Sequence, residues 1–131
     1  MKKIAIAIIT MSLLLGCNES FLAEKESCFK HLATLEKEFN DGYSIEGESA
    51  YTQVSEIFYS PKVDSCLYIL ETRSNSMNAP GSNGIIVNYD LYNLLTKERL
   101  IDVKGCDGEL HCGLSTTEAE TTFKSKIVDY K

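Results

Sequence analysis

Five cysteines are the residues of this 131-residue chain that could support the widest range of chemistry. A cysteine thiolate can attack a substrate, hold a metal ion or pair in a disulfide. The segment from Cys106 to Cys112 encloses Asp107, Glu109 and His111, so soft and hard metal ligands lie close together in the sequence. No Cys-x2-Cys pair accompanies them, although such a pair is typical of zinc sites. The sequence therefore predicts neither a metal site nor a cofactor.

Arrangements suited to catalysis are sparse. Cys28 and His31 are near neighbours on a predicted helix, but the helical spacing places Cys28 on the buried face, and a catalytic thiol must be free and activated. No Gly-x-Ser-x-Gly motif occurs. The carboxylates that could approach one another across a sheet are Glu46, Glu48, Glu56, Glu71 and Asp90. Glycosidase-type chemistry needs such a pair inside a cleft, which a domain of this size rarely offers, so we expect no enzymatic activity.

The first sixteen residues have the pattern of an export signal. Lys2 and Lys3 form a basic start, and the segment 4–15 is apolar except for two hydroxyl side chains. This run is shorter than the roughly 20 apolar residues that span a bilayer. A basic start followed by a short apolar core is typical of a cleaved secretory signal. The alternative is a buried N-terminal helix, against which stands the absence of any acidic residue before Glu19.

The signal ends in Leu14-Leu15-Gly16-Cys17, which resembles the lipobox of bacterial lipoproteins. The resemblance covers only the first 17 residues. It implies diacylglycerol on the sulfur of Cys17, cleavage after Gly16 and acylation of the new amino terminus, so the expected membrane contact is a lipid anchor at Cys17. Two or three acyl chains are enough for stable anchoring. The alternative is a soluble secreted protein cut nearby.

The residue after the cysteine bears on localisation. In Gram-negative lipoproteins, which this segment resembles, Asp at this place often retains the protein at the inner membrane, and here Asn18 occupies it. We therefore expect a lipid-anchored protein of the cell envelope, in the outer membrane of a Gram-negative bacterium, facing the periplasm or the cell surface.

The expected mature chain is acidic and forms one domain. Residues 1–16 are the cleaved signal, 17–19 the lipidated end with a short tether, and 20–131 a single domain. Without Lys2 and Lys3, 11 of the 13 basic residues remain against 19 acidic ones, a net charge of −8. Such a charge argues against a nucleic-acid partner, because binding phosphates requires clustered Lys and Arg.

An even number of cysteines remains beside the lipid-bearing one, which in an exported chain indicates disulfides. Four cysteines allow three connectivities. We favour Cys28 with Cys66, which joins the N-terminal helix to a strand, and Cys106 with Cys112, which closes a short loop between glycines.

The pattern of apolar residues predicts an α+β fold: an N-terminal helix, an antiparallel four-stranded meander and a C-terminal helix, stapled by disulfides. Ser115 and Glu118 match a capping box that starts the C-terminal helix. We expect both helices on one face of the sheet, and a loop at 43–49. The predicted elements are a helix at 20–40, strands at 53–60, 65–73, 85–92 and 99–104, and a helix that begins after Ser115.

The best candidate for a binding surface combines a tyrosine with a long loop. Tyr92 lies on the polar side of its strand, so we expect it to be exposed, and tyrosine is a frequent anchor at recognition surfaces. The polar loop 74–84 contains Met77, Asn78 and Pro80, and long loops in small domains are often functional.

These features predict a lipid-anchored, non-catalytic module that binds or inhibits a protein partner in the cell envelope. Two alternatives stay open: a structural or assembly accessory of an envelope complex, and a small envelope hydrolase. The sequence leaves the identity of the partner and the oligomeric state open.

Overall fold

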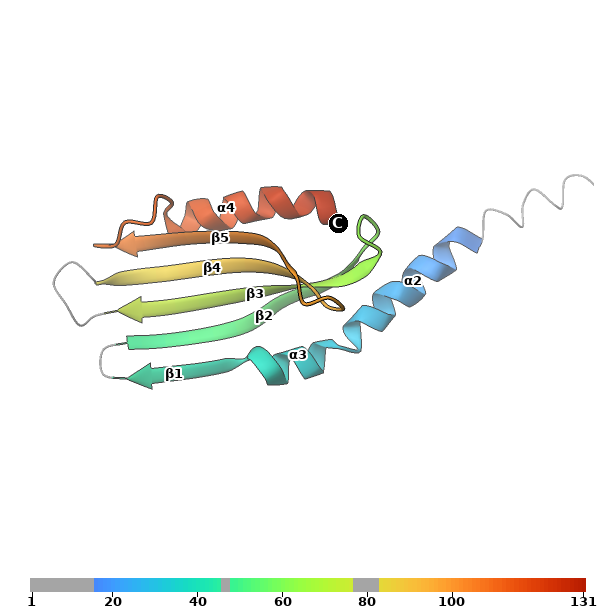
Figure 1. The fold of residues 1–131 in the computed structure, drawn as a ribbon, viewed down its shortest axis with the longest axis horizontal. Coiled ribbons are helices and arrows are strands. Elements are labelled where there is room, and N and C mark those ends of the chain that lie inside the picture. Colours follow the sequence, from blue (N-terminus) through green and yellow to red (C-terminus); the bar gives the residue numbers. More distant parts are fainter. Residues whose placement is uncertain (1–15, 46–47, 77–82) are drawn as a thin grey trace, which may run out of the picture.

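The computed structural model describes residues 16–45, 48–76 and 83–131. Within these ranges helices lie at both ends of the chain and strands between them (Figure 1). The elements are helices α2 (Gly16–Phe29) and α3 (Leu32–Phe39), strands β1 (Asp41–Ile45), β2 (Glu48–Ser60), β3 (Ser65–Ser76), β4 (Gly84–Asn93) and β5 (Arg99–Gly108), helix α4 (Thr116–Ile127) and a 3₁₀ turn, η1 (Val128–Tyr130).

The strands form one antiparallel sheet in the order β1-β2-β3-β4-β5, in which each strand pairs with its neighbours in the sequence. The predicted fold class is confirmed: an N-terminal helical segment, four long antiparallel strands in one sheet, a C-terminal helix and two disulfides. The short strand β1 is an addition to this prediction, because residues 43–49 were expected to form a loop. β1 pairs with the first residues of β2, from Glu48 to Thr52, and thereby extends the sheet by one strand.

The predicted single helix at 20–40 is wrong in detail. The chain instead forms α2 and α3, which are separated by a turn at Lys30 and His31. The amide of His31 donates to the carbonyl of Cys28 over 3.1 Å, which closes this turn. The expected apolar side of the helix is nevertheless the side that packs: Cys28 and Leu35 are buried against the sheet.

The sheet is covered on both faces, and the expectation that both helices lie on one face is wrong. Strand β3 explains why, since its consecutive residues Leu67, Tyr68, Ile69 and Leu70 are all buried. Side chains alternate along a strand, so Leu67 and Ile69 lie on one face and Tyr68 and Leu70 on the other. An unbroken apolar run of this kind is typical of a strand with both faces covered.

Each face has its own core. On the face that we call the α4 face, Ala119, Phe123 and Ile127 of α4 pack against β3, β4 and β5. On the opposite face, which we call the α3 face, Cys28 of α2 and Leu35 of α3 pack against β2 and β3. The two helical segments therefore cover different halves of the sheet, and part of each face stays open.

Helix α4 begins at the predicted capping box. The hydroxyl of Ser115 accepts the amide of Glu118 over 3.2 Å, and the Glu118 carboxylate accepts the amide of Ser115 over 2.8 Å. The helix comes very close to β5 at Gly105, where an added Cβ would lie 2.6 Å from the Cβ of Ala119. Glycine is therefore required at this position by the close approach of helix and strand.

Both predicted disulfides are present. Cys28 and Cys66 join α2 to the start of β3 with a Cα–Cα distance of 5.5 Å, and Cys106 and Cys112 close the short loop after β5 with a distance of 5.6 Å. The first bridge lies in the core of the α3 face, where Cys28 has no exposed surface. It fixes the N-terminal helical segment to the sheet.

Among the helices of the described residues, none combines the length and the apolar character needed to cross a membrane.

Candidate functional site

Tyr92 does not have the exposed position expected of a recognition residue. Its ring is half-buried and stacks on the ring of Tyr68 with a centroid distance of 5.5 Å, and Tyr68 also stacks on Phe39 at 5.9 Å. Burial raises the pKa of the Tyr92 hydroxyl, and the charge of Asp90 adds to this effect. The aromatic column ties α3, β3 and β4 together, so the expectation that Tyr92 is exposed is wrong.

The other residues of the expected binding surface, Met77, Asn78 and Pro80, lie outside the described residues. The connection that contains them is shorter than expected, because β3 continues to Ser76 and β4 begins at Gly84.

The cysteines and histidines do not come together in a reactive arrangement within the described ranges. All four cysteines of the domain are in disulfides, and His31 lies exposed in the turn between α2 and α3. His111 is exposed in the loop closed by Cys106 and Cys112. Nowhere in the described part of the chain do three or more His, Cys, Asp or Glu side chains lie close enough together to hold a metal ion.

One pair with catalytic spacing escaped the sequence analysis. Ser27 and Lys30 are three residues apart, as in the Ser-x-x-Lys motif of some hydrolases. The motif could have been found from the sequence alone. Both side chains are exposed near the end of α2, whereas the nucleophile of such enzymes needs a shaped site that holds the substrate.

The carboxylates considered for acid–base chemistry are divided between the two faces. Glu56 and Glu71 lie on the α4 face, where each is paired with a cation. Asp90 lies on the α3 face, where burial raises its pKa, the charge of Asp102 raises it further and Arg99 lowers it. The side chains of Glu46 and Glu48 are outside the described set.

The α4 face carries a groove. It lies between α4 and the strands β2 and β3, and its volume is about 500 Å³. Helix α4 covers β4 and β5 but leaves the α4 face of β2 open, and this arrangement creates the groove. Its floor is apolar and consists of Ile69, Phe123 and Ile127, which are residues of the core. We call this surface the α4 groove.

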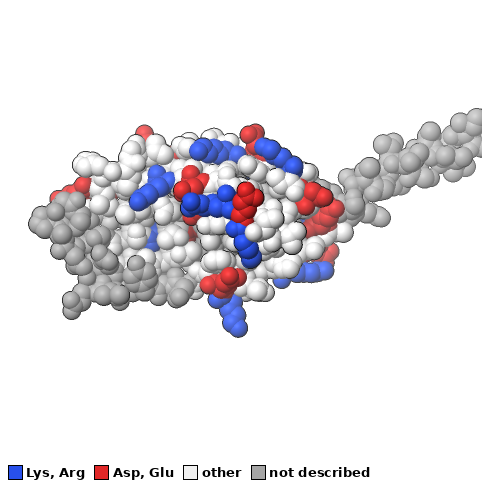
Figure 2. Space-filling view, in the orientation of Figure 1, with Lys and Arg blue, Asp and Glu red and all other residues white. Residues whose placement is uncertain are grey.

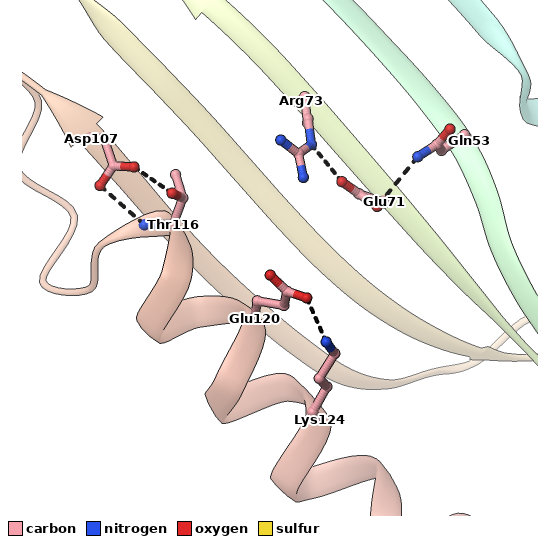
Figure 3. A network of polar contacts seen from close by, with 7 residues as sticks. All are labelled: Gln53, Glu71, Arg73, Asp107, Thr116, Glu120 and Lys124. Atoms are coloured by element: carbon pink, nitrogen blue, oxygen red, sulfur yellow. Dashed lines mark hydrogen bonds and ion pairs between the residues drawn. The ribbon is translucent and has the colours of Figure 1, made fainter.

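Three ion pairs, each made of one basic and one acidic side chain, lie at the rim of the α4 groove. Arg73 pairs with Glu71 on β3, and Lys124 pairs with Glu120 on α4 over 2.5 Å. The close-up in Figure 3 shows these two pairs facing each other across the groove. At the other end of the groove, Lys131 contacts both carboxylate oxygens of Glu56, at 2.8 and 2.9 Å, and its ammonium lies 5.3 Å from the ring of Phe58.

Two neighbouring groups hold the sheet side of the groove in place. The amide nitrogen of Gln53 on β2 donates to the second carboxylate oxygen of Glu71 over 3.3 Å, so Glu71 is shared between two strands (Figure 3). The ring of Tyr89 stacks on Phe123 at 5.4 Å, and burial followed by the charges of Glu71 and Glu120 raises the pKa of its hydroxyl. Tyr89 therefore stays protonated at physiological pH.

The three ion pairs of the rim differ in exposure. In Lys131–Glu56 the two side chains keep 44% and 42% of their surface accessible, and in Lys124–Glu120 they keep 69% and 45%. Exposed pairs of this kind contribute about 0–1 kcal/mol each to stability, so little is lost when they open. In the third pair the Arg73 side chain is 43% exposed but the Glu71 side chain only 12%, so this pair is partly buried.

Tyr51 extends the α4 groove along the open part of the face. It stands opposite Arg73 in the β2–β3 register, so both side chains lie on the α4 face, and Tyr51 is 43% exposed. Tyrosine and arginine are enriched among the residues that dominate binding energy at protein interfaces. Sequence reasoning missed this pair because Tyr51 and Arg73 come together only through the register of two strands.

The charges on the surface are mixed. Figure 2 shows basic and acidic side chains interspersed on one face of the molecule, without a continuous patch of either sign. The face shown in Figure 2 therefore carries no field of one sign.

Comparison of the chain with known protein families, with characterised proteins and with solved structures finds no match.

Proposed function

We propose that this protein is a lipid-anchored, non-catalytic module of the cell envelope that binds a protein partner through the α4 groove. The proposed anchor is Cys17, in the lipobox-like segment at the end of an export signal. The proposed location is the outer membrane of a Gram-negative bacterium, because Asn18 follows the cysteine.

The single observation that carries the binding role is the composition of the α4 groove. An apolar floor surrounded by charged side chains resembles the apolar centre and polar rim of protein interfaces. Tyr51 and Arg73, which stand side by side at one end, supply the residue types that contribute most at such interfaces. A volume of about 500 Å³ can accept a few side chains of a partner.

The chemistry of the groove favours binding over catalysis. Each of its acidic residues Glu56, Glu71 and Glu120 is held by a neighbouring cation, and the hydrogen bond and charge of Lys124 lower the pKa of Glu120. A general acid needs a raised pKa near the working pH. Carboxylates that already pair with cations are instead suited to accept hydrogen bonds from Lys or Arg of a partner, while the cations can donate to its Asp or Glu.

Crosslinking at defined positions tests this proposal. A photoreactive phenylalanine analogue replaces Ser55, which lines the α4 groove, or Tyr51, which stands beside Arg73 of the groove. The control position is Lys104, an exposed residue on the α3 face. The anchored protein is irradiated in living cells and adducts are identified by mass. We expect one partner to be linked from Tyr51 and Ser55 and not from Lys104. Equal adducts from all three positions, or none from the groove, contradict the proposal.

A further inference from the structure

Exposed apolar side chains gather at one end of the molecule. Leu22 and Phe29 on α2 are 63% and 58% exposed, and Leu95, in the turn between β4 and β5, is 84% exposed. Figure 1 shows that α2 projects from the same end of the sheet at which β4 turns into β5. Exposed large apolar residues in a cluster mark an interaction site more often than scattered ones do.

The segments that carry these three side chains are both held at the start of strand β3. Leu22 and Phe29 are seven residues apart, or two helical turns, so they share one side of α2. Cys28, next to Phe29, is bonded to Cys66 at the start of β3. The carbonyl of Cys66 accepts the amide of Leu94 over 2.9 Å, which holds the β4–β5 turn, and thus Leu95, at the same place.

The distance from the lipobox cysteine defines what this end faces. At 1.5 Å per helical residue, Leu22 lies about 8 Å and Phe29 about 18 Å along α2 from Cys17. The interfacial region of a bilayer is about 5–8 Å deep on each side, so if Cys17 carries acyl chains there, both side chains stay within this region when α2 lies along the membrane surface. A lipid surface is then the nearest apolar medium available to them.

Charged groups of both signs surround these apolar side chains. Lys30 and Lys97 are exposed beside Phe29 and Leu95, and Lys97 lines a shallow pocket together with Leu95. A lysine at such a position can place its ammonium group at a lipid phosphate while its stem stays on apolar surface. In the structure the Lys97 ammonium lies 5.7 Å from the ring centroid of Tyr68, so it would have to leave this ring to reach a phosphate. The acidic residues Glu24, Glu26 and Glu98 belong to the same segments, so the attraction to a membrane rests first on the apolar side chains.

We infer that this end of the domain, which we call the lipid-facing end, rests on the bilayer surface with Leu22, Phe29 and Leu95 inserted among the headgroups. The inference rests on the proposed anchoring of Cys17. It adds a second membrane contact to the lipid anchor, and it fixes the orientation of the domain. Tyr51 and Ile85, the exposed apolar residues of the opposite half of the sheet, then point away from the membrane.

Tryptophan fluorescence tests the inference because the chain contains no tryptophan. Leu95→Trp and Phe29→Trp place a single probe at the lipid-facing end, and Ile85→Trp is the matched control at another exposed apolar position. Each lipidated variant is purified from membranes and reconstituted in phosphatidylethanolamine and phosphatidylglycerol vesicles with or without brominated acyl chains. We expect brominated lipid to quench the two test probes severalfold more than the Ile85→Trp probe.

The outcomes separate this inference from the anchor itself. Flotation with the vesicles and the mass of the N-terminal peptide report whether Cys17 carries lipid. A protein that is lipidated and floats, but whose Leu95→Trp and Phe29→Trp probes are quenched no more than Ile85→Trp, overturns the inference and leaves the anchor intact. A protein without lipid at Cys17 overturns both.

Discussion

The two disulfides should differ in their contribution to stability, and the difference can be calculated from the loops they close. Cys28 and Cys66 are 38 residues apart in the sequence, and Cys106 and Cys112 are 6 apart. A crosslink removes loop-closure entropy from the unfolded chain, and the loss grows with the logarithm of loop length. This relation gives about 4 kcal/mol for the first bridge and about 2 kcal/mol for the second.

The surroundings of the bridges act in the same direction. Each bridge joins a buried cysteine, Cys28 or Cys106, to a half-buried one, but only the first bridge packs in a core, that of the α3 face. Replacing Cys28 and Cys66 by alanine therefore also leaves a small cavity next to Leu35 and Ile57. The variant that lacks the long-range bridge should lose at least twice as much unfolding free energy as the variant that lacks the short one.

Urea unfolding measures this difference. The variants are Cys28→Ala with Cys66→Ala, and Cys106→Ala with Cys112→Ala, both in a Cys17→Ser background that removes the lipid and the remaining thiol. With a urea m-value on the order of 1.5 kcal/mol/M, the transition midpoints of the two variants should differ by about 1.3 M. If the second variant is destabilised as much as the first, the loop-length reasoning is refuted.

Three further changes have defined outcomes. Gly105→Ala should lower the melting temperature by several degrees, which corresponds to about 1–3 kcal/mol of unfolding free energy, because the new methyl group collides with Ala119. An unchanged melting temperature would show that α4 can move away. Cys17→Ser should shift the protein from the membrane to the soluble fraction of cells, and unchanged fractionation would refute the lipid anchor. Asp90→Asn should stabilise the fold at pH 7, because burial and then Asp102 raise the pKa of Asp90 above its usual 3.8, so its charged form is disfavoured in the folded state. In urea unfolding, this gain should disappear as the pH falls below the usual carboxyl pKa and Asp90 is protonated in both states; a gain that is independent of pH would contradict the assignment.

The sequence predicted those elements whose signals are local. The capping box at Ser115 and Glu118 fixes where α4 starts, and the alternation of Val87, Tyr89 and Leu91 marks β4. Both signals depend on a few neighbouring residues. The disulfides followed from the compartment and from the predicted places of their cysteines in the chain.

The features that sequence reasoning missed depend on distant parts of the chain. Residues 41–45 have weak strand propensity, and β1 exists because it pairs with the edge of β2. No proline or glycine marks the break between α2 and α3 at Lys30 and His31. The burial of both faces of the sheet could have been predicted from the uninterrupted apolar run 67–70. A strand with only one buried face would instead alternate between apolar and polar residues.

The candidate site was even less accessible to prediction. Tyr92 was expected on the surface because the residues on the same side of β4 are polar. The ring of Tyr68 on β3 lies directly opposite, however, and the two rings stack. Tyr51 and Arg73 lie far apart in the sequence and meet through strand register. A groove between a helix and a sheet requires knowledge of which strands the helix leaves uncovered, and that is a property of the tertiary structure.

The central claim is that the α4 groove binds the partner, and a matched pair of charge removals tests it most directly. Arg73→Gln removes a positive charge at the rim of the groove, and Lys104→Gln removes the same charge on the α3 face. Affinity for the partner captured from Tyr51 is measured for both variants. The account predicts a fall of roughly tenfold or more for Arg73→Gln, as for a dominant interface residue, and no change for Lys104→Gln. Equal affinities for the two variants would contradict it.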